Sequence, residues 1–261
     1  MSHKGKERLD ILLVNRGLVP TRAKAKGMIL AGEVTVDGQR VDKAGTAVSL
    51  TANIEIKTPL PYVSRGGFKL AGALESFEIE VADRICADVG ACTGGFTDVL
   101  LQAGAQKVFA IDVGYGQLDW KLRQDERVVV LERTNARYLE ALDQPVSFVG
   151  IDVSFISLKL ILPAVMKWLD GPQRTDIVAL IKPQFEAGRA QVGKGGIVRD
   201  TAVHQFVLHD LIQWTADHGL GAQGLVRSSI KGSDGNVEFL VWLKPQHANQ
   251  IESTQIDALL S

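Results

Sequence analysis

Two lysines and two acidic residues stand where a chain of alternating strands and helices would expose them together: Lys69, Asp152, Lys182 and Glu238. Asp152 and Lys182 each end an apolar run, and open α/β sheets bind ligands at the carboxyl ends of their strands. A lysine that is partly buried beside a second ammonium group can act as a general base. The four residues therefore predict proton-transfer chemistry.

The two remaining positions fit the same edge of the sheet. Lys69 lies at the start of a helix before the first strand of the sheet, and Glu238 opens the last strand. A single lysine or glutamate at a strand end can instead be a solvated residue that opposes aggregation. This alternative is weak for Lys182, because a buried-looking strand delivers it next to Pro183.

A glycine-rich segment follows the first strand and opens a helix. It contains Asp88, Gly90, Ala91, Cys92, Thr93, Gly94 and Gly95 in the spacing G-x-x-x-G-G. Glycines allow close approach of the backbone to a ligand and leave helix amide groups available to it. The next strand ends at Asp112, whose carboxylate can accept hydrogen bonds from ribose hydroxyls. Taken alone, the glycine-rich segment can be an ordinary turn that binds no ligand, and Asp112 can simply cap the strand.

This order of elements resembles the S-adenosylmethionine site of Rossmann-like methyltransferases more than a nicotinamide dinucleotide site. The resemblance implies that Asp88, Gly90 and Gly94 shape the methionine end and that Asn135 approaches the adenine. Cys92 lies in the loop without a paired histidine and is interpreted as a small loop residue. With two cysteines, no CxxC spacing and no histidine cluster, we expect no metal, no disulfide and a reducing cytoplasm.

Seven strand-like apolar runs, most of them separated by helical patterns, predict an α/β fold with a mostly parallel, doubly wound sheet. The last two runs lack a helix between them, which predicts an antiparallel pair at one edge. The runs are Ile85–Val89, Val108–Val113, Val128–Leu131, Val146–Asp152, Ile177–Ile181, Gly224–Ile230 and Val237–Leu243.

The net charge of −1 for 261 residues hides a basic N-terminal region. Residues 1–60 hold ten Lys or Arg and six Asp or Glu, whereas residues 61–261 hold 19 and 24. Two helices are expected, over Arg8–Asn15 and after a Thr21 cap, followed by short strands around an Asp37-Gly38 turn. Over residues 8–56 this pattern resembles the small RNA-binding domain of ribosomal protein S4, which implies binding to structured RNA through phosphates and shape.

Several residues outside the glycine loop are candidate RNA contacts. Phe155 can stack on a flipped-out base or lie in the core, and 188–196 can close over substrate or be an ordinary surface loop. The basic side chains of the N-terminal helices can equally be a solvated surface. The candidates are Arg8, Arg22, Lys26, Lys43, Arg65, Phe155, Arg189 and Lys194.

Residues 62–70, 88–97, 151–157 and 181–186 together resemble the TlyA (hemolysin A) family of ribosomal RNA 2′-O-methyltransferases, which shares its catalytic domain with the FtsJ type. The resemblance implies a Rossmann-like S-adenosylmethionine-dependent methyltransferase domain and a Lys-Asp-Lys-Glu tetrad on the four residues named first. It implies methylation of a cytidine ribose in 16S and/or 23S rRNA. Our hypothesis makes Lys182 the base, assisted by Lys69, with Asp152 and Glu238 holding the lysines.

We expect an RNA-binding domain over 1–57, a linker over 58–65 and a methyltransferase domain over 66–261. The expected partners are ribosomal RNA and ribosomal subunits, with no membrane and no stable protein partner. In the family that the chain resembles, short terminal extensions are associated with whether one or both subunits are modified, so the resemblance implies that the residues before the first helix and the 246–261 tail favour methylation of both subunits. Three alternatives stay open: a non-enzymatic ribosome-associated RNA binder, a membrane-active hemolysin and a small-molecule methyltransferase. The hemolysin lacks support because no charge-free stretch approaches the ~18 apolar residues of a membrane helix.

Overall fold

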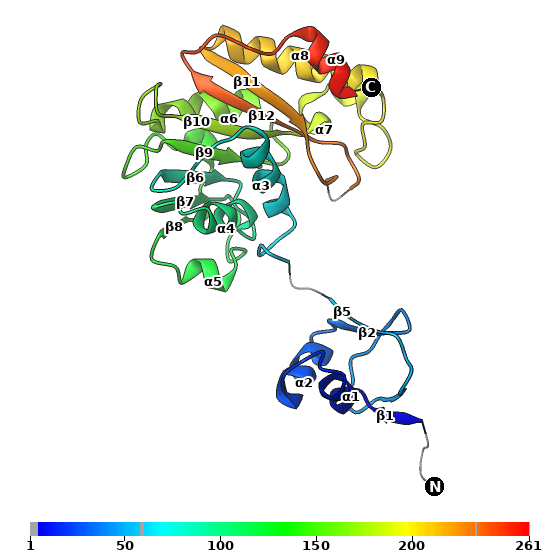
Figure 1. Ribbon diagram of the computed structural model, residues 1–261. Coiled ribbons are helices and arrows are strands. Elements are labelled where there is room, and N and C mark those ends of the chain that lie inside the picture. The colour runs from blue at the N-terminus through cyan, green and yellow to red at the C-terminus, as the bar shows by residue number, and fades with distance from the viewer. Residues whose placement is uncertain (1–4, 58–59, 233, 261) are drawn as a thin grey trace. The chain divides into compact units, whose positions relative to one another are not determined.

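The computed structural model describes residues 5–57, 60–232 and 234–260 (Figure 1). The chain divides into two compact units, Met1–Pro61 and Tyr62–Ser261. The second unit begins four residues before the expected boundary, because the Val63 amide donates to the buried carboxylate of Asp98 at 2.9 Å. In the expected linker, Thr58 and Pro59 lie outside the described residues.

The N-terminal unit contains the two expected helices packed on short strands. Its elements are β1 (Lys6–Arg8), α1 (Leu9–Asn15), α2 (Arg22–Leu30), β2 (Val34–Val36), β3 (Gln39–Arg40), β4 (Ala47–Ser49) and β5 (Ile54–Ile56). Thr21 caps α2 by accepting from the Lys24 amide, as the sequence predicted. Asp37 and Gly38 both have positive φ, 50° and 77°, which the tight β2–β3 turn requires.

A small core holds this unit together. Leu9, Leu13, Ile29 and Val34 are fully buried, so both helices and β2 contribute to one cluster. The pairing of β1 with β4 was not predicted, since strands of three residues carry no detectable alternation.

The second unit is built on a seven-stranded sheet in the order β11-β12-β10-β9-β6-β7-β8. Its strands are β6 (Ile85–Val89), β7 (Lys107–Ile111), β8 (Val128–Leu131), β9 (Phe148–Ile151), β10 (Asp176–Ile181), β11 (Leu220–Arg227) and β12 (Phe239–Pro245). Strands β6 to β10 are parallel, and β12 pairs antiparallel with both β10 and β11. The predicted fold class and antiparallel edge pair are confirmed.

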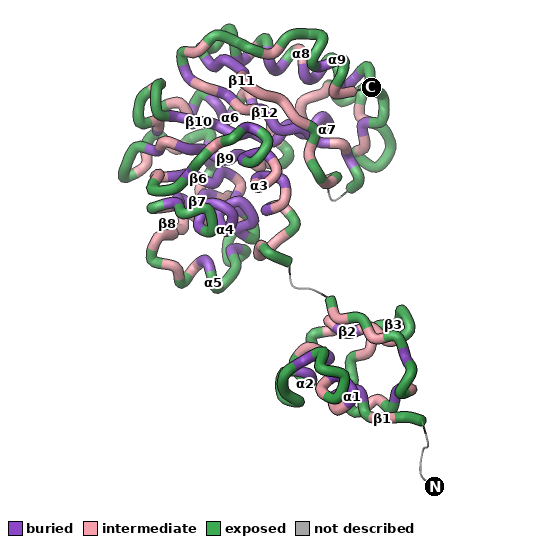
Figure 2. The backbone as a smooth tube through the Cα atoms, viewed as in Figure 1, coloured by how far each residue is buried: buried purple, intermediate pink, exposed green. Residues whose placement is uncertain are grey.

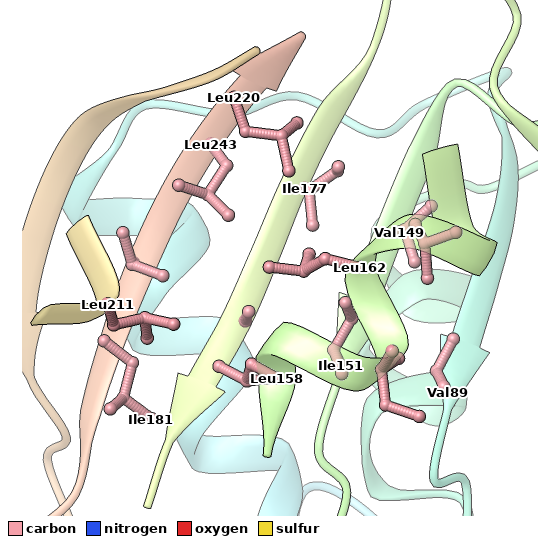
Figure 3. Packing of buried hydrophobic residues seen from close by; sticks show 14 of the residues in the cluster. Val89, Val149, Ile151, Leu158, Leu162, Ile177, Ile181, Leu211, Leu220 and Leu243 are labelled. Carbon is pink, nitrogen blue, oxygen red and sulfur yellow. The ribbon is translucent and has the colours of Figure 1, made fainter. Parts of the chain in front are cut away.

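Helices cover both faces of this sheet. They are α3 (Gly66–Ser76), α4 (Gly95–Gln102), α5 (Trp120–Arg123), α6 (Leu158–Val165), α7 (Pro183–Glu186), α8 (Thr201–Asp217) and α9 (Ser253–Leu260). Alternate residues of β10 pack on opposite faces: Ile177 and Ile181 face α6 and α8, while Leu180 faces α3 and α4. The first of these cores is drawn in Figure 3, and Figure 2 shows buried residues along the central strands, whereas the edge strand β8 is only half-buried. Parallel strands buried on both faces explain the continuous apolar runs in the sequence.

The boundaries differ from the sequence prediction mainly in β11. This strand begins at Leu220, four residues before the predicted start, because Leu220–Ala222 pair with the end of β12 before a bulge at Ala222/Gly224. Among the described residues, no helix is both long and apolar enough to cross a membrane.

Candidate active site

The carboxyl ends of the central strands and the start of β12 meet at one edge of the sheet. Val89 pairs with Ile151, and Ile181 pairs with Phe239. Asp152 and Lys182 therefore follow β9 and β10 at the edge where Glu238 precedes the antiparallel β12. Lys69 reaches the same edge from the first turns of α3.

The four side chains form one cluster of ion pairs, which we call the tetrad. Lys182 Nζ lies 2.7 Å from Asp152 Oδ1, and Lys69 Nζ lies 2.7 Å from Glu238 Oε2. Lys69 Nζ also lies 3.9 Å from Asp152 Oδ2, so this carboxylate stands between two ammonium groups. Both lysine side chains are only 10% exposed. The structure thus brings all four predicted residues together in a nearly buried, charge-balanced cluster.

Ser154 belongs to the same cluster, although the sequence analysis did not select it. Lys182 Nζ donates a hydrogen bond to Ser154 Oγ at 2.8 Å. Its position two residues after Asp152 is the only sequence signal that could have indicated it. Lys182 is therefore held by a carboxylate and a hydroxyl, which fix the direction of its ammonium group.

A cavity of about 420 Å³ opens above the tetrad. The tetrad, Ser154 and the glycine loop form its wall, together with Ser64, Arg65 and Lys231. Sequence reasoning did not select Ser64 and Lys231, although Ser64 lies within the 62–70 motif and Lys231 directly follows the predicted strand Gly224–Ile230. Arg65, a predicted RNA contact, is exposed at this cavity.

Asp88 is fully buried at the end of β6. Its Oδ2 accepts hydrogen bonds from the Thr97 amide at 2.8 Å and the Thr97 hydroxyl at 2.6 Å, which ties the strand to α4. Its Oδ1 is buried without a hydrogen-bond partner in the part of the chain that the structure describes. Burial raises the pKa of Asp88 to about 7, although the hydrogen bonds from Thr97 oppose the shift.

Two glycines of the loop are required by geometry. Gly90 has φ of 86°, and a side chain there would collide with the backbone carbonyl of Asp152. Gly94 has φ of 94°, and a side chain there would collide with Leu118 and Leu122. At Gly90 the loop therefore approaches the end of β9 more closely than any residue with a Cβ allows.

Asp112 performs the structural role that the sequence left open. Its Oδ2 accepts from the Cys92 amide at 2.8 Å and its Oδ1 from the Gly114 amide at 2.6 Å. Asp112 is still partly exposed, and each carboxylate oxygen has room for a further hydrogen bond. Capping the strand and binding a ligand are thus compatible here. The Cys92 thiol is exposed and donates to Gln117 Oε1 at 3.4 Å.

A second cavity of about 520 Å³ lies on the other side of the glycine loop. Asp112 and Asn135 line it together with the apolar side chains of Val113, Ile156 and Ile161. Gly90, Cys92, Asp152 and Ser154 line both cavities, so the two share one wall. The first cavity is charged and faces the tetrad. The second is more apolar and contains the Asp112 carboxylate and the Asn135 amide.

The predicted RNA contacts differ in their surroundings. Arg8 and Arg22 both bind the buried carboxylate of Asp10, at 3.1 and 2.8 Å. Burial opposes ionisation of Asp10, but the hydrogen bonds from the two arginines outweigh it and lower its pKa. Lys26 and Lys43 are exposed on the same unit.

The remaining candidates lie in the second unit. Arg189 and Lys194 are exposed on the loop between α7 and α8, and Phe155 is 89% exposed. The core alternative for Phe155 is therefore wrong. The loop is anchored by the buried Asn236, which accepts from the Val198 amide and donates to the Gly196 carbonyl, both at 3.0 Å.

A doubly wound sheet with a glycine loop and a lysine–carboxylate cluster at its carboxyl edge is the arrangement expected of a Rossmann-like methyltransferase domain. In the described residues, no group of three or more His, Cys, Asp or Glu could hold a metal ion. Comparison with known families agrees: residues 62–245 match the FtsJ-like methyltransferase and residues 7–54 match the S4 domain. The chain therefore belongs to the FtsJ-like methyltransferase family.

Relatives of known name are similar over nearly the whole chain. The 16S/23S rRNA (cytidine-2′-O)-methyltransferase TlyA of Mycobacterium tuberculosis is 48% identical over 92% of this chain and 90% of its own. Hemolysin A of Brachyspira hyodysenteriae is 44% identical over 89% of this chain and 98% of its own. A solved structure from Streptococcus thermophilus, provisionally named a hemolysin, has a TM-score of 0.75 at 46% identity and covers 98% of this chain and 94% of that one. The resemblance to the TlyA family is confirmed.

Proposed function

We propose that this protein is a ribosomal RNA (cytidine-2′-O)-methyltransferase that uses S-adenosylmethionine to methylate a ribose 2′-hydroxyl of 16S and/or 23S rRNA. The observation that carries the proposal is the tetrad, in which two nearly buried lysines share Asp152 beside the glycine loop. The name of the M. tuberculosis relative, 16S/23S rRNA (cytidine-2′-O)-methyltransferase TlyA, supports ribosomal RNA as the substrate.

The residues around the two cavities fit S-adenosylmethionine. Asp88 Oδ1, which has no hydrogen-bond partner among the described residues and lies in the cavity wall, fits a polar ligand held closely against the loop. The cavity with Asp112 and Asn135 suits adenosine, and the cavity with Asp88 and the tetrad suits the methionine end. The proposed cofactor contacts are Asp88, Gly90, Ala91, Cys92, Thr93, Gly94, Gly95, Asp112 and Asn135. When bound, the cofactor supplies an electrophilic methyl group on a sulfonium.

The tetrad residues divide the work of proton transfer. Lys182 would take up the 2′-hydroxyl proton at Nζ, and the bound cofactor would supply the methyl group that the ribose oxygen gains. Asp152 and Ser154 hold Nζ in place at 2.7 and 2.8 Å. With the proton on Lys182, the two ammonium groups balance the two carboxylates. The cluster therefore stabilises the positive charge that the proton transfer places on Lys182. Lys69 and Glu238 complete that balance.

RNA binding is assigned to both units. Arg8, Arg22, Lys26 and Lys43 give the N-terminal unit exposed cations for phosphate contacts. Arg65, Arg189 and Lys194 supply cations in the methyltransferase unit, and exposed Phe155 offers a ring on which a flipped base can stack.

Methyl transfer to purified subunits tests the proposal. The full chain is incubated with radiolabelled S-adenosylmethionine and, separately, small subunits, large subunits and protein-free 16S and 23S rRNA, and the label is mapped by nuclease digestion and mass spectrometry. We expect 2′-O-methylcytidine at a single position in each RNA that is modified. Incorporation into none of the four substrates, or label on a base instead of a ribose, would contradict the proposal. Tight RNA binding without incorporation would favour the non-enzymatic alternative.

A further inference from the structure

The one-turn helix α7 and the turn 152–157 lie side by side and are joined at successive points. Lys182, just before α7, binds Asp152 and Ser154. The ring of Phe185 packs against that of Phe155, with centroids 5.0 Å apart. The order of contacts along Lys182–Glu186 matches the order of residues along the turn. These contacts therefore hold the turn 152–157 in one conformation.

Glu186 makes the last of these contacts, through two hydrogen bonds. Its Oε2 accepts a hydrogen bond from the Ser157 hydroxyl at 2.6 Å, and its Oε1 accepts from the Leu158 amide at 2.8 Å. Leu158 is the first residue of α6, so the carboxylate satisfies an amide that the helix itself cannot satisfy. Burial raises the pKa of Glu186, and these two hydrogen bonds oppose the shift. The proposed chemistry makes no use of this carboxylate.

The turn that Glu186 closes is in a conformation that needs support. Phe155 has φ of 64°, in the left-handed region that bulky residues rarely adopt. Such a conformation persists only where the surroundings determine it. At one end the Asp152 amide is held by the Val89 carbonyl at 2.8 Å, and at the other end Glu186 holds Ser157 and Leu158. Fixing both ends leaves the Phe155 ring exposed.

We propose that Glu186 is a positioning residue for the methyl transfer: by holding Ser157 and Leu158 it keeps the turn 152–157 in the conformation that presents Phe155 to the target nucleotide and Ser154 to Lys182. This inference rests on the proposed function and adds to it. Glu186 acts through the turn and touches no reacting atom.

Three variants separate positioning from simple stability. Glu186→Ala removes both acceptors. Glu186→Gln preserves both contacts, because its amide oxygen can accept from Leu158 and its amide nitrogen can donate to Ser157. Asp200→Ala is the matched control: Asp200 caps α8 by accepting from the Ala202 amide at 2.9 Å, away from the turn.

The measurements are kcat/KM for ribosomal RNA at saturating cofactor, and Tm. We expect Glu186→Ala to lower kcat/KM by about 10²-fold, the scale of a 1 Å misplacement. Glu186→Gln should stay within about threefold of the wild type, and Asp200→Ala should lose comparable Tm with little loss of rate. In a Phe155→Ala background, Glu186→Ala should cost at least about threefold less than in the wild type, because the two act through one turn.

Each result decides the inference. Wild-type kcat/KM in Glu186→Ala, an equal loss in Asp200→Ala, or full additivity with Phe155→Ala would overturn it. If Glu186→Ala fails to fold, Ser157→Ala, which removes one of the two hydrogen bonds, takes its place and should give a smaller loss in the same direction. Absence of methyl transfer by the wild-type chain would overturn the proposed function instead.

Discussion

Each unit contains a carboxylate shared by two cations, and the two clusters differ in how far the cations reach into water. In the N-terminal unit, Asp10 binds Arg8 and Arg22, whose side chains are 48% and 51% exposed. In the methyltransferase unit, Asp152 lies between Lys69 and Lys182, each 10% exposed. The first arrangement keeps its two cations half-exposed to water, and the second buries its two cations almost completely.

The types of cation match this difference. Arginine keeps its proton in proteins and presents several donors in a rigid plane, which suits phosphate binding. Lysine can lose its proton when it is buried, which suits a base. The same carboxylate motif therefore suits the proposed RNA binding in one unit and the proposed proton transfer in the other.

The strongest test of this contrast is Lys182→Arg beside Lys182→Ala. Arginine retains the positive charge but cannot accept the hydroxyl proton, so both variants should lose about 10²–10⁴-fold in single-turnover methyl transfer. Lys167→Ala is the control, because Lys167 pairs with Glu140 at an exposed site. This variant should keep wild-type methyl-transfer activity. If Lys182→Arg retained near wild-type turnover, the role of Lys182 would be electrostatic only.

Asp88 extends the comparison to a carboxylate that has no cation partner among the residues that the structure describes. Its pKa is raised from 3.8 to about 7, mainly by burial. Between these values the folded chain keeps a proton that the unfolded chain has released, so this group makes the free energy of unfolding fall as the pH rises through that window. The difference should reach up to about 4 kcal/mol.

Asp88→Asn isolates this contribution. The free energy of unfolding of the wild type, relative to that of Asp88→Asn, should decrease as the pH rises from 4 to 8. Denaturant unfolding of both chains in parallel measures this difference. Other titrating groups are shared by the two chains and cancel. A constant difference across this range would show that Asp88 ionises normally.

Asp10 should show the opposite pH dependence, with a smaller effect. Its pKa is lowered, so the stability that it adds is present above about pH 4 and is lost as the pH falls. Asp10→Asn removes charge-assisted hydrogen bonds to Arg8 and Arg22 and should cost about 1–3 kcal/mol in local stability. Hydrogen exchange of the α1 and α2 amides in the full chain measures this.

RNA affinity provides the second readout for Asp10→Asn. Freed arginines lose their fixed orientation, so RNA binding should weaken even though the net charge becomes more positive. Glu55→Gln, an exposed change of equal charge on the same unit, is the control. Equal strengthening of binding by both variants would mean that charge alone, without orientation, governs this surface.

The sequence predicted the sheet and the tetrad because both depend on local signals. Continuous apolar runs mark strands buried on both faces, and charged residues at their ends mark the edge. Ser154 and the contacts of Glu186 were not predicted, because they join segments about 28 residues apart that meet only in the fold. The pairing of Arg22 with Asp10, 12 residues apart, was invisible for the same reason.

The smallest expected effect concerns the loop that carries Arg189 and Lys194. Both are exposed, and the structure records no ion pair for either among the residues it describes. If each touches one RNA phosphate, alanine at either position should reduce the slope of log affinity against log salt by about 1. Lys107→Ala is the control, because Lys107 begins β7 at the opposite edge of the sheet. Slopes equal to the control would make 188–196 an ordinary surface loop and leave phosphate binding to the arginines held by Asp10.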